Sequence, residues 1–385
     1  MPSELSTSRP TPAAADSRAQ RFARSLLEQA GLGLDGYQPW DMRLNHPGVP
    51  QRALAQGNLG LGEAYMDGDW DCDQLDEFFA RLLRSGVVDQ VSPASLIFHA
   101  LQARLCNLQT ANRAWAVGER HYDLGNDFYA AMLDPRMTYT CGYWKDAEDL
   151  AQAQEAKLDL VCRKLDLRPG MRVLDIGCGW GSFMAFAAER YGVECVGVTI
   201  SREQCEWARK RYAGLPLEFR LLDYRDLDER FERIVSIGMF EHVGRKNHRT
   251  FMEVAARCLD DDGLFLLHTI GKNQRRSVPD RWIDKYIFPN GDLPSIGQIG
   301  DAADGLLVVE DLHNFGADYD RTLMAWARNF EASWPRFAEE LGERFYRMWR
   351  YYLLSCAGAF RARDIQLWQW VLSRRGVLGG YRRVS

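Results

Sequence analysis

Polar residues that could carry chemistry follow several apolar runs of this 385-residue sequence. Glu241 and His242 follow the run IVSIG, His268 and the backbone of Ile270 lie in LFLLHTIG, and Tyr319 comes after HNFGAD. A lone Glu, His or Tyr usually has a structural role. Polar groups at successive strand ends, however, converge in a cleft, which is typical of an active site. We therefore expect these residues to form a catalytic site.

Cys141 lies among aromatic residues in DPRMTYTCGYW, and its type leaves four roles open: nucleophile, metal ligand, disulfide partner or packed core thiol. A nucleophilic thiol needs a base or a positive neighbour that lowers its pKa, and the local sequence supplies none. A zinc site would need a second Cys or His at short spacing, which is absent, so we expect no metal. The nine cysteines are scattered and odd in number, which favours reduced thiols in a cytosolic protein.

A glycine-rich turn after an apolar run indicates a nucleotide-binding loop. The stretch LDIGCGWGSF contains Asp175, Gly177, Gly179 and Gly181 and precedes the helical pattern SFMAFAAERY. Glycines let the backbone approach a ligand and present amide groups at a helix start. The pattern G-x-G-x-G alone is weak evidence, because many turns are rich in glycine. The acidic residue before the first glycine and the glycine spacing favour S-adenosylmethionine over NAD.

Two further run ends extend the expected cofactor site. The run VECVGVTI ends near Thr199, with Gln204 one turn into the next helix, where an NAD-binding domain often has a carboxylate. The run LEFRLLD ends at Asp223, which could accept a hydrogen bond from an adenine amino group, and Tyr224 could stack on the ring. A helix-capping role is equally compatible with Asp223.

Short apolar runs alternate with helical patterns after residue 165, and this alternation predicts the sheet that positions these residues. The runs are MRVLDIG, VECVGVTI, LEFRLLD, ERIVSIG, GLFLLHTI, LLVVEDL and IQLWQWVLS. Such a pattern is typical of a doubly wound, mainly parallel α/β sheet, whose ligands bind at the carboxyl ends of the strands. We expect a Rossmann-like catalytic domain over residues 166–385, with seven strands of which the last is antiparallel.

The first part of the chain has a different pattern. Residues 1–20 are rich in Ser, Thr, Pro and Ala and lack the apolar core of a secretory signal, so we expect a disordered tail. Helical spacing of apolar residues over 21–115 predicts a small helical domain. Residues 116–165 then form a linker and a segment that covers the active site.

The composition limits the classes of partner. A net charge of −5 argues against a nucleic-acid-binding protein. No run reaches the roughly 18 apolar residues of a membrane-spanning helix, so membrane contact would be peripheral. Aromatic residues make up 12% of the chain, which is high enough to line an apolar pocket.

Eight motifs, in order, make the sequence resemble the bacterial cyclopropane-fatty-acyl-phospholipid synthases. They are HYDLGNDFYAAMLDPRMTYTCGYW, VLDIGCGWGSF, VGVTISREQ, IVSIGMFEHVG, LFLLHTIG, KYIFPNGDLPS, NFGADYDRTLMAW and CAGAFRARDIQLWQ. The resemblance extends from about residue 46 to the C-terminus. It implies a methyltransferase that takes a methylene group from S-adenosylmethionine and adds it across the cis double bond of an unsaturated acyl chain in a phospholipid, forming a cyclopropane ring.

The resemblance also implies roles for individual residues. A bicarbonate ion acting as general base would be held by Cys141, Glu241, His268, Tyr319 and the main chain of Ile270. Cys141 would then be a weak donor to an anion rather than an attacking thiol. S-adenosylmethionine would be held by Tyr139, Thr140, Gly177, Gly179, Thr199, Gln204 and Asp223. The aromatic faces that could stabilise a carbocation belong to Tyr139, Tyr143, Trp144, Phe240 and Tyr319.

A lipid substrate implies a docking surface. Two basic loops follow the catalytic runs, GRKNHR with Arg245, Lys246 and Arg249, and GKNQRR with Lys272, Arg275 and Arg276. Anionic headgroups attract such residues by about 1 kcal/mol each, although ordinary solvated loops carry similar charge. We expect a cytoplasmic homodimer bound peripherally to the inner-membrane surface. The helical domain would contact lipid or a second subunit.

Two other functions fit parts of the pattern. Related enzymes methylate small amines, or add a methyl branch to an acyl chain without closing a ring. A non-catalytic module that binds lipid or S-adenosylmethionine would be expected to lose Glu241, His268 or Tyr319 first. All three are present, which favours catalysis.

Overall fold

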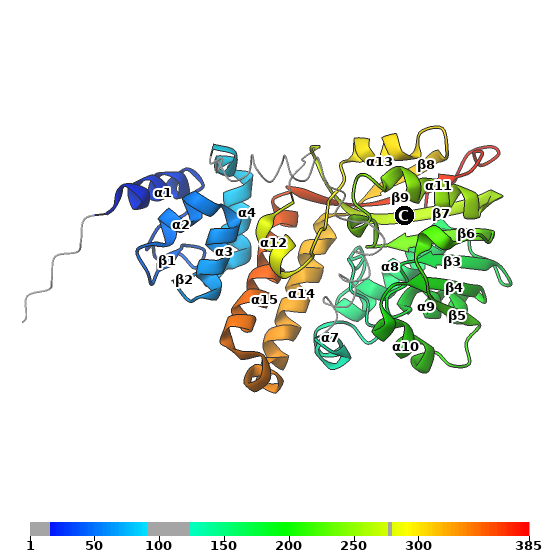
Figure 1. The fold of residues 1–385 in the computed structure, drawn as a ribbon, viewed down its shortest axis with the longest axis horizontal. Helices are drawn as coiled ribbons and strands as arrows, with labels where there is room; N and C mark the ends of the chain where they lie inside the picture. Colours follow the sequence, from blue (N-terminus) through cyan, green and yellow to red (C-terminus); the bar gives the residue numbers. More distant parts are fainter. Residues whose placement is uncertain (1–15, 91–123, 276–278, 385) are drawn as a thin grey trace, which may run out of the picture.

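The computed structural model describes residues 16–90, 124–275 and 279–384, which form a helical N-terminal part and a larger α/β part (Figure 1). Residues 1–15 of the expected tail lie outside the described residues, as do residues 91–123 around the expected boundary between the helical domain and the linker. Residues 18–20, which we had assigned to the tail, belong to helix α1 (Arg18–Gln29), whose N-terminus is capped by the Ser17 side chain.

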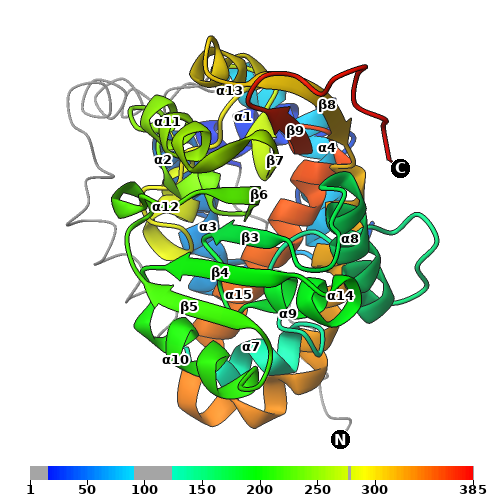
Figure 2. The same ribbon diagram turned by 90° about the vertical axis from the view of Figure 1, so that its right-hand side faces the viewer.

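A seven-stranded sheet forms the core of the α/β part (Figure 2). In spatial order its strands are β5 (Leu217–Leu221), β4 (Glu194–Thr199), β3 (Arg172–Ile176), β6 (Phe231–Ile237), β7 (Leu259–Lys272), β9 (Ile365–Ser373) and β8 (Val308–Asn314). The first five strands are parallel, whereas β9 lies between β7 and β8 and runs antiparallel to both. The predicted Rossmann-like sheet with an antiparallel last strand is therefore confirmed.

Helices cover both faces of this sheet, which explains why its central strands, such as β3, β4 and β9, are buried on both sides. One face packs against α8 (Leu150–Lys164), α9 (Ser182–Tyr191) and α10 (Arg202–Arg211). The other face packs against α11 (His248–Cys258) and α13 (Ile296–Ala303). Because both faces are covered, ligands can reach the strands at their ends.

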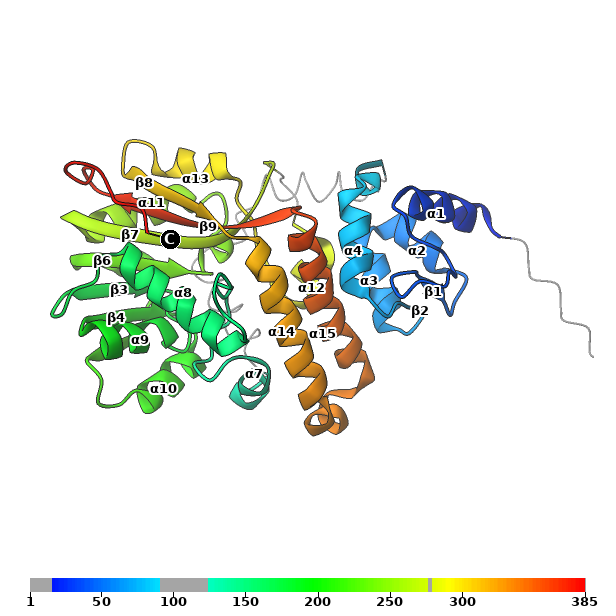
Figure 3. The same cartoon turned by 180° about the vertical axis from the view of Figure 1, so that it is seen from behind.

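The helical N-terminal part consists of α2 (Val49–Gln56), α3 (Asn58–Met66) and α4 (Leu75–Arg84) together with α1, and of a small ribbon of β1 (Arg43–Leu44) and β2 (Trp70–Asp71). A central layer of helices lies between this part and the sheet (Figure 1 and Figure 3). Between them stand α14 (Ala317–Ser333) and α15 (Ala338–Arg361), the two long helices that connect β8 to β9 (Figure 3). The short helices α7 (Asn126–Met132) and α12 (Arg281–Tyr286) complete this central layer.

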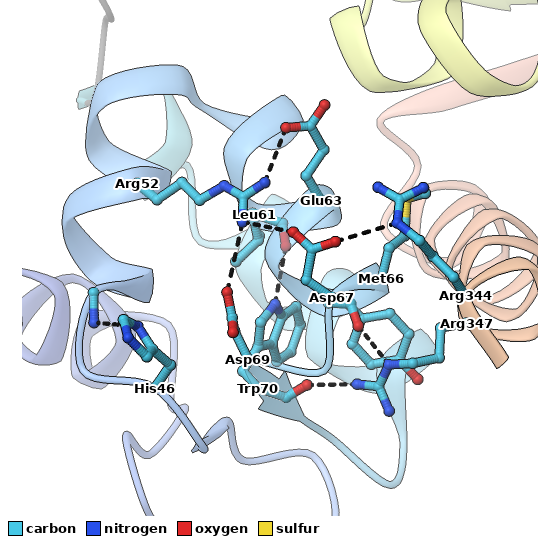
Figure 4. Close-up of polar contacts among 12 residues, drawn as sticks. His46, Arg52, Leu61, Glu63, Met66, Asp67, Asp69, Trp70, Arg344 and Arg347 are labelled. Atoms are coloured by element: carbon cyan, nitrogen blue, oxygen red, sulfur yellow. Dashed lines mark hydrogen bonds and ion pairs between the residues drawn. The ribbon is translucent and has the colours of Figure 1, made fainter.

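Arginine side chains join α15 to the N-terminal helices (Figure 4). Arg347 Nη2 donates to Trp70 O at 2.8 Å and to Asp71 Oδ1 at 2.7 Å, while Arg344 pairs with Asp67 at 3.2 Å. Arg52 of α2 pairs with Glu63 and Asp67, which fixes α2 against α3. The two parts of the molecule are therefore tied by charge-assisted hydrogen bonds as well as by apolar packing.

Within the described ranges, no helix combines the length and the apolar composition needed to span a bilayer.

Candidate active site

One cavity of about 720 Å³ extends from the carboxyl ends of the parallel strands to the N-terminal helices. Its wall includes the glycine-rich loop after β3, the segment after β6 and the first turns of α14. It also includes apolar side chains of α15, α4, α2 and α1, namely Ala359, Phe360, Phe79, Leu82, Ala53 and Leu26. A polar end is thus joined to an apolar end, which suits a ligand with a charged head and a long apolar part.

The glycine-rich loop lies at the polar end as predicted. Gly177 has φ of 87°, and a Cβ there would meet Met239 Cγ at 2.6 Å, so only glycine fits between β3 and β6. Gly177 and Gly179 line the cavity, whereas Gly181 lies outside its wall and starts α9. Asp175 lines the cavity with Oδ1 lacking a hydrogen-bond partner among the described residues, and burial raises its pKa to about 7.

The other predicted cofactor residues also reach the cavity, but two of them are engaged elsewhere. Thr199 and Gln204 are buried and line its wall. Both Asp223 carboxylate oxygens accept from the Arg225 guanidinium, at 2.8 and 2.6 Å. Burial would raise the pKa of Asp223, yet these bonds bring it below its usual range. The Tyr224 ring packs on Phe251, with 5.2 Å between ring centroids.

The segment 138–144 is fixed between α8 and α14 and carries two more of the predicted residues. Thr140 O accepts from Gln154 Nε2 at 2.7 Å, and Thr140 Oγ1 accepts from Lys157 Nζ at 2.9 Å. The Thr140 methyl group lies against Gly238, where a Cβ would come within 2.7 Å. Tyr139 OH lies 3.0 Å from Tyr352 OH of α15. Tyr139 and Thr140 both line the cavity.

Cys141 lies behind the cavity wall, fully buried. Its Sγ donates to Gly142 O at 3.1 Å, and Thr322 Oγ1 lies 3.9 Å from it. Burial raises the pKa of this thiol well above its usual value, and the nearby Asp318 carboxylate acts in the same direction. The thiol is protonated at neutral pH, which excludes an activated nucleophile. The eight described cysteines are all free, and no group of metal ligands occurs among the described residues.

Glu241 is a buried acid in the cavity wall. It lies in the turn after β6, and its Oε1 accepts from the Ile270 backbone N at 2.6 Å. Its Oε2 has no partner among the described residues. Burial raises the pKa of Glu241 to about 7, because the ionised form loses its hydration. The group can therefore exchange a proton near neutral pH.

His268 and Tyr319 lie around Glu241. His268 pairs with Ile237, the last residue of β6, so it is level with that strand's end although β7 continues to Lys272. Its ring is buried behind the wall, with Nδ1 3.2 Å from Gln369 Nε2 and with Nε2 unpartnered among the described residues. Burial lowers its pKa well below the usual value, so the ring is neutral. Tyr319 of α14 lines the cavity, and burial raises its pKa.

The structure separates the aromatic candidates. Tyr139 and Tyr319 line the cavity, and the Tyr319 ring stacks on Phe360 with 4.5 Å between centroids. Tyr143, Trp144 and Phe240 lie outside its wall. Phe240 instead stacks on His248, with 4.4 Å between centroids. Of the five aromatic residues proposed from the sequence, Tyr139 and Tyr319 therefore remain candidates to stabilise a cation in the cavity.

Lys157 and Trp180 are polar residues of the wall that were not identified from the sequence. Lys157 of α8 is 1% exposed and lies beside Thr140 and Asp175. Nothing in its helical pattern distinguishes it from an exposed lysine, so no signal could have found it. Trp180, inside the glycine-rich loop, donates from Nε1 to Asn126 Oδ1 at 2.7 Å and so ties that loop to α7. Its place within G-x-G-x-G was a signal that could have been used.

Comparison with known proteins identifies the family of the chain. A family model described as mycolic acid cyclopropane synthetase matches residues 109–370. The chain is 54% identical over 368 residues to the cyclopropane-fatty-acyl-phospholipid synthase of Escherichia coli K12, covering 95% of this chain and 96% of that protein. The chain belongs to the cyclopropane synthase family. The resemblance identified from the sequence motifs is thereby confirmed.

Solved structures of the family share the fold. The cyclopropane synthase MmaA2 of Mycobacterium tuberculosis has a TM-score of 0.64 and 33% identity, covering 68% of this chain and 98% of its own. The mycolic acid cyclopropane synthase CmaA1, in a complex with SAH and CTAB, has a TM-score of 0.63 and 35% identity, covering 68% and 98%. The family fold therefore accounts for the α/β part, whereas the E. coli relative also spans the N-terminal helices.

Proposed function

We propose that this protein transfers a methylene group from S-adenosylmethionine across the cis double bond of an unsaturated acyl chain in a membrane phospholipid and so forms a cyclopropane ring. The observation that carries the proposal is the single cavity that joins the glycine-rich loop, Glu241 and Tyr319 to an apolar wall. The family membership and the phospholipid named in the E. coli relative support the same reaction.

In this reaction the alkene attacks the sulfonium methyl group, the carbon–sulfur bond breaks, and S-adenosylhomocysteine leaves. One proton then leaves the transferred carbon as the ring closes. An alkene is a weak nucleophile, so holding it in line with the methyl group supplies much of the rate. The positive charge that develops on carbon would face Tyr139 and Tyr319, whose rings can stabilise it in a cavity with apolar walls.

A small base for that proton fits beside Glu241. The residues expected to hold it are Cys141, Glu241, His268, Tyr319 and the main chain of Ile270. Glu241, Tyr319 and Ile270 line the cavity, although the Ile270 N–H already donates to Glu241 Oε1, whereas Cys141 and His268 lie behind the wall. Glu241 can add a proton because its pKa is near 7. Glu241 Oε2 and His268 Nε2 lack partners among the described residues, as expected of groups that await a ligand. Bicarbonate, when bound, would supply the base. Glu241 would share its proton with that anion, because two bare anions in contact repel.

Docking on lipid would use the basic loops near the cavity. Lys272 lines the cavity, and its bridge to Ser295 places it beside Ile296, whose side chain is 45% exposed. Arg245 and Lys272 both lie near Asp292 at the wall. Arg249 and Arg275 instead pair with Glu253 and Asp301, and Arg276 lies outside the described residues. An apolar side chain among cations is typical of a contact with an anionic bilayer.

Under this proposal the protein works at the cytoplasmic face of the inner membrane as a homodimer, with the N-terminal helices as a second contact with lipid or with another subunit. The apolar wall that α1, α2 and α4 contribute to the cavity supports the lipid contact.

The test is turnover on vesicles that contain unsaturated phospholipid and anionic lipid, with S-adenosylmethionine and with or without bicarbonate. The expected product gains one CH₂ per acyl chain and loses the alkene signal, and the rate rises with bicarbonate. A gain of CH₂ without a ring would indicate a methyl-branching enzyme. A gain on a small amine would indicate the other alternative, and cofactor binding without any product would indicate a binding module.

A further inference from the structure

Lys157 is a buried cation in the cavity wall for which the proposed reaction assigns no role. Its side chain is 1% exposed, and the same wall includes Thr140 and Asp175. Removing an ammonium group from water costs several kcal/mol unless nearby groups compensate. The surroundings of this cation therefore indicate what it binds.

The described residues satisfy only part of the hydrogen-bonding capacity of Lys157. Lys157 Nζ donates to Thr140 Oγ1 at 2.9 Å, and it forms no ion pair with a carboxylate of the described residues. An ammonium group carries three N–H donors. Two of them therefore have no acceptor among the described residues, and Lys157 lines the cavity.

Three groups in the protein act on this cation from a distance. Burial lowers the pKa of Lys157 to about 8, and Asp134, Cys141 and Asp175 oppose that effect. The Cys141 thiol is protonated, and Asp134 is satisfied by backbone N–H groups of Thr138 and Arg136, at 2.8 and 3.0 Å. Asp175 alone keeps an unpartnered oxygen among the described residues. The wall thus presents a cation with free donors near a carboxyl with a free acceptor.

We propose that Lys157 binds a carboxylate-type anion inside the cavity. Two sources share this chemistry: the methionine carboxylate of S-adenosylmethionine, whose ammonium group would then meet Asp175, and the free bicarbonate ion. The proposal rests on the proposed function, because it assigns a residue to that reaction's own ligands. The hydrogen bond to Thr140 Oγ1 orients the Lys157 side chain.

Lys164 provides a matched control. It lies seven residues along the same helix, is also fully buried, and has a pKa lowered by burial to about 8. Its Nζ lies 3.0 Å from His313 Nδ1, and it does not line the cavity. Lys164→Met therefore removes a buried ammonium group from α8 without changing the cavity wall.

The experiment measures S-adenosylhomocysteine affinity by calorimetry for the wild type, Lys157→Met and Lys164→Met. If the cofactor carboxylate is the ligand, Lys157→Met should bind about 10-fold to 100-fold more weakly, because a hydrogen bond to a charged group is lost. Methylthioadenosine, which lacks the amino-acid group, should bind all three proteins alike. If bicarbonate is the ligand, S-adenosylhomocysteine affinity should stay unchanged while the bicarbonate concentration for half-maximal rate rises about 10-fold or more.

Several outcomes would overturn the inference. Unchanged values for both ligands in Lys157→Met, or equal losses in Lys164→Met, would leave Lys157 with a purely structural role. Lys157→Gln replaces the Met variant if that variant does not fold. A wild type that binds no S-adenosylhomocysteine would instead overturn the proposed function.

Discussion

The cavity and the contact between α15 and the N-terminal helices both contain charged groups, but they use them in opposite ways. At the contact, Arg347 and Arg344 of α15 are matched by carboxylates and a carbonyl (Figure 4). In the cavity wall, Glu241 and Asp175 each keep a polar atom without a partner among the described residues, and so does His268 behind that wall. Charged groups whose hydrogen bonds are satisfied hold elements together. Buried polar groups without a partner destabilise the fold, and a bound ligand can offset that cost.

The variant Glu241→Gln gives the strongest test of this difference between the cavity and the contact. The amide can still accept from the Ile270 N–H, but it cannot take up or give a proton. We expect turnover on lipid vesicles to fall at least about 100-fold, in the range of lost acid–base catalysis, while S-adenosylhomocysteine affinity stays within about 3-fold. A variant with wild-type turnover would remove Glu241 from the mechanism.

The second prediction concerns the contact between α15 and the N-terminal part, where the charged groups are hydrogen-bonded. Arg347→Met removes the side-chain donor to Trp70 O, Tyr65 O and Asp71 Oδ1 at a site where the arginine side chain is 15% exposed. Asp71 Oδ2 still accepts from Asn45 Nδ2, and Tyr65 O still accepts from the Gly68 N–H. We expect the free energy of unfolding in urea to fall by about 2 kcal/mol. Arg344→Met is the control, because that side chain is 56% exposed and its pair with Asp67 should contribute less than about 1 kcal/mol. Equal losses in the two variants would contradict the distinction.

The third prediction follows from the raised pKa of Glu241. Between its unfolded value and about 7, the folded protein binds the proton more tightly than the unfolded chain does, so stability falls as pH rises through that range. Glu241→Gln lacks this effect, whereas the similar contribution of Asp175 is common to both proteins. The wild type should therefore lose about 1–2 kcal/mol relative to the variant between pH 5 and pH 8, measured by denaturation at both values. A constant difference would mean that Glu241 is ionised at low pH.

The smallest effect is expected for Cys141→Ser. The thiol is protonated, lies behind the wall and donates only to Gly142 O, so a hydroxyl can replace it. We expect turnover to fall less than about 10-fold, as for a lost weak hydrogen bond. Complete loss of turnover, with the fold intact by circular dichroism, would restore a covalent role for this cysteine.

The sheet and the positions of Glu241 and Tyr319 could be predicted because they depend on local patterns. Apolar runs that alternate with helices determine a parallel sheet, and the residues after each run must then lie at one edge. The glycine-rich loop was predictable for the same reason, since Gly177 must allow Met239 to approach.

Other features depend on tertiary contacts that no local pattern records. Lys157 is buried only because the segment 138–144 folds over α8, and Asp223 is engaged because Arg225 turns back toward it. Phe240 was predicted to face the substrate because it precedes Glu241 in the sequence. In the structure it lies outside the cavity wall and stacks on His248. Closeness along the chain predicted the strand ends well but not the direction of each side chain.

The position of β9 between β7 and β8 has a consequence for the order in which the molecule can be assembled. The strand spans Ile365–Ser373, so the ribosome must synthesise all the residues that precede it before β7 and β8 can be joined. The helices α14 and α15, which bring Tyr319 and Tyr352 to the cavity, lie in the connection that this last strand closes. Until then the nascent chain exposes the edges of β7 and β8 and part of the apolar cavity wall. A chain released before β9 would therefore be a candidate for aggregation and proteolysis rather than a slower enzyme.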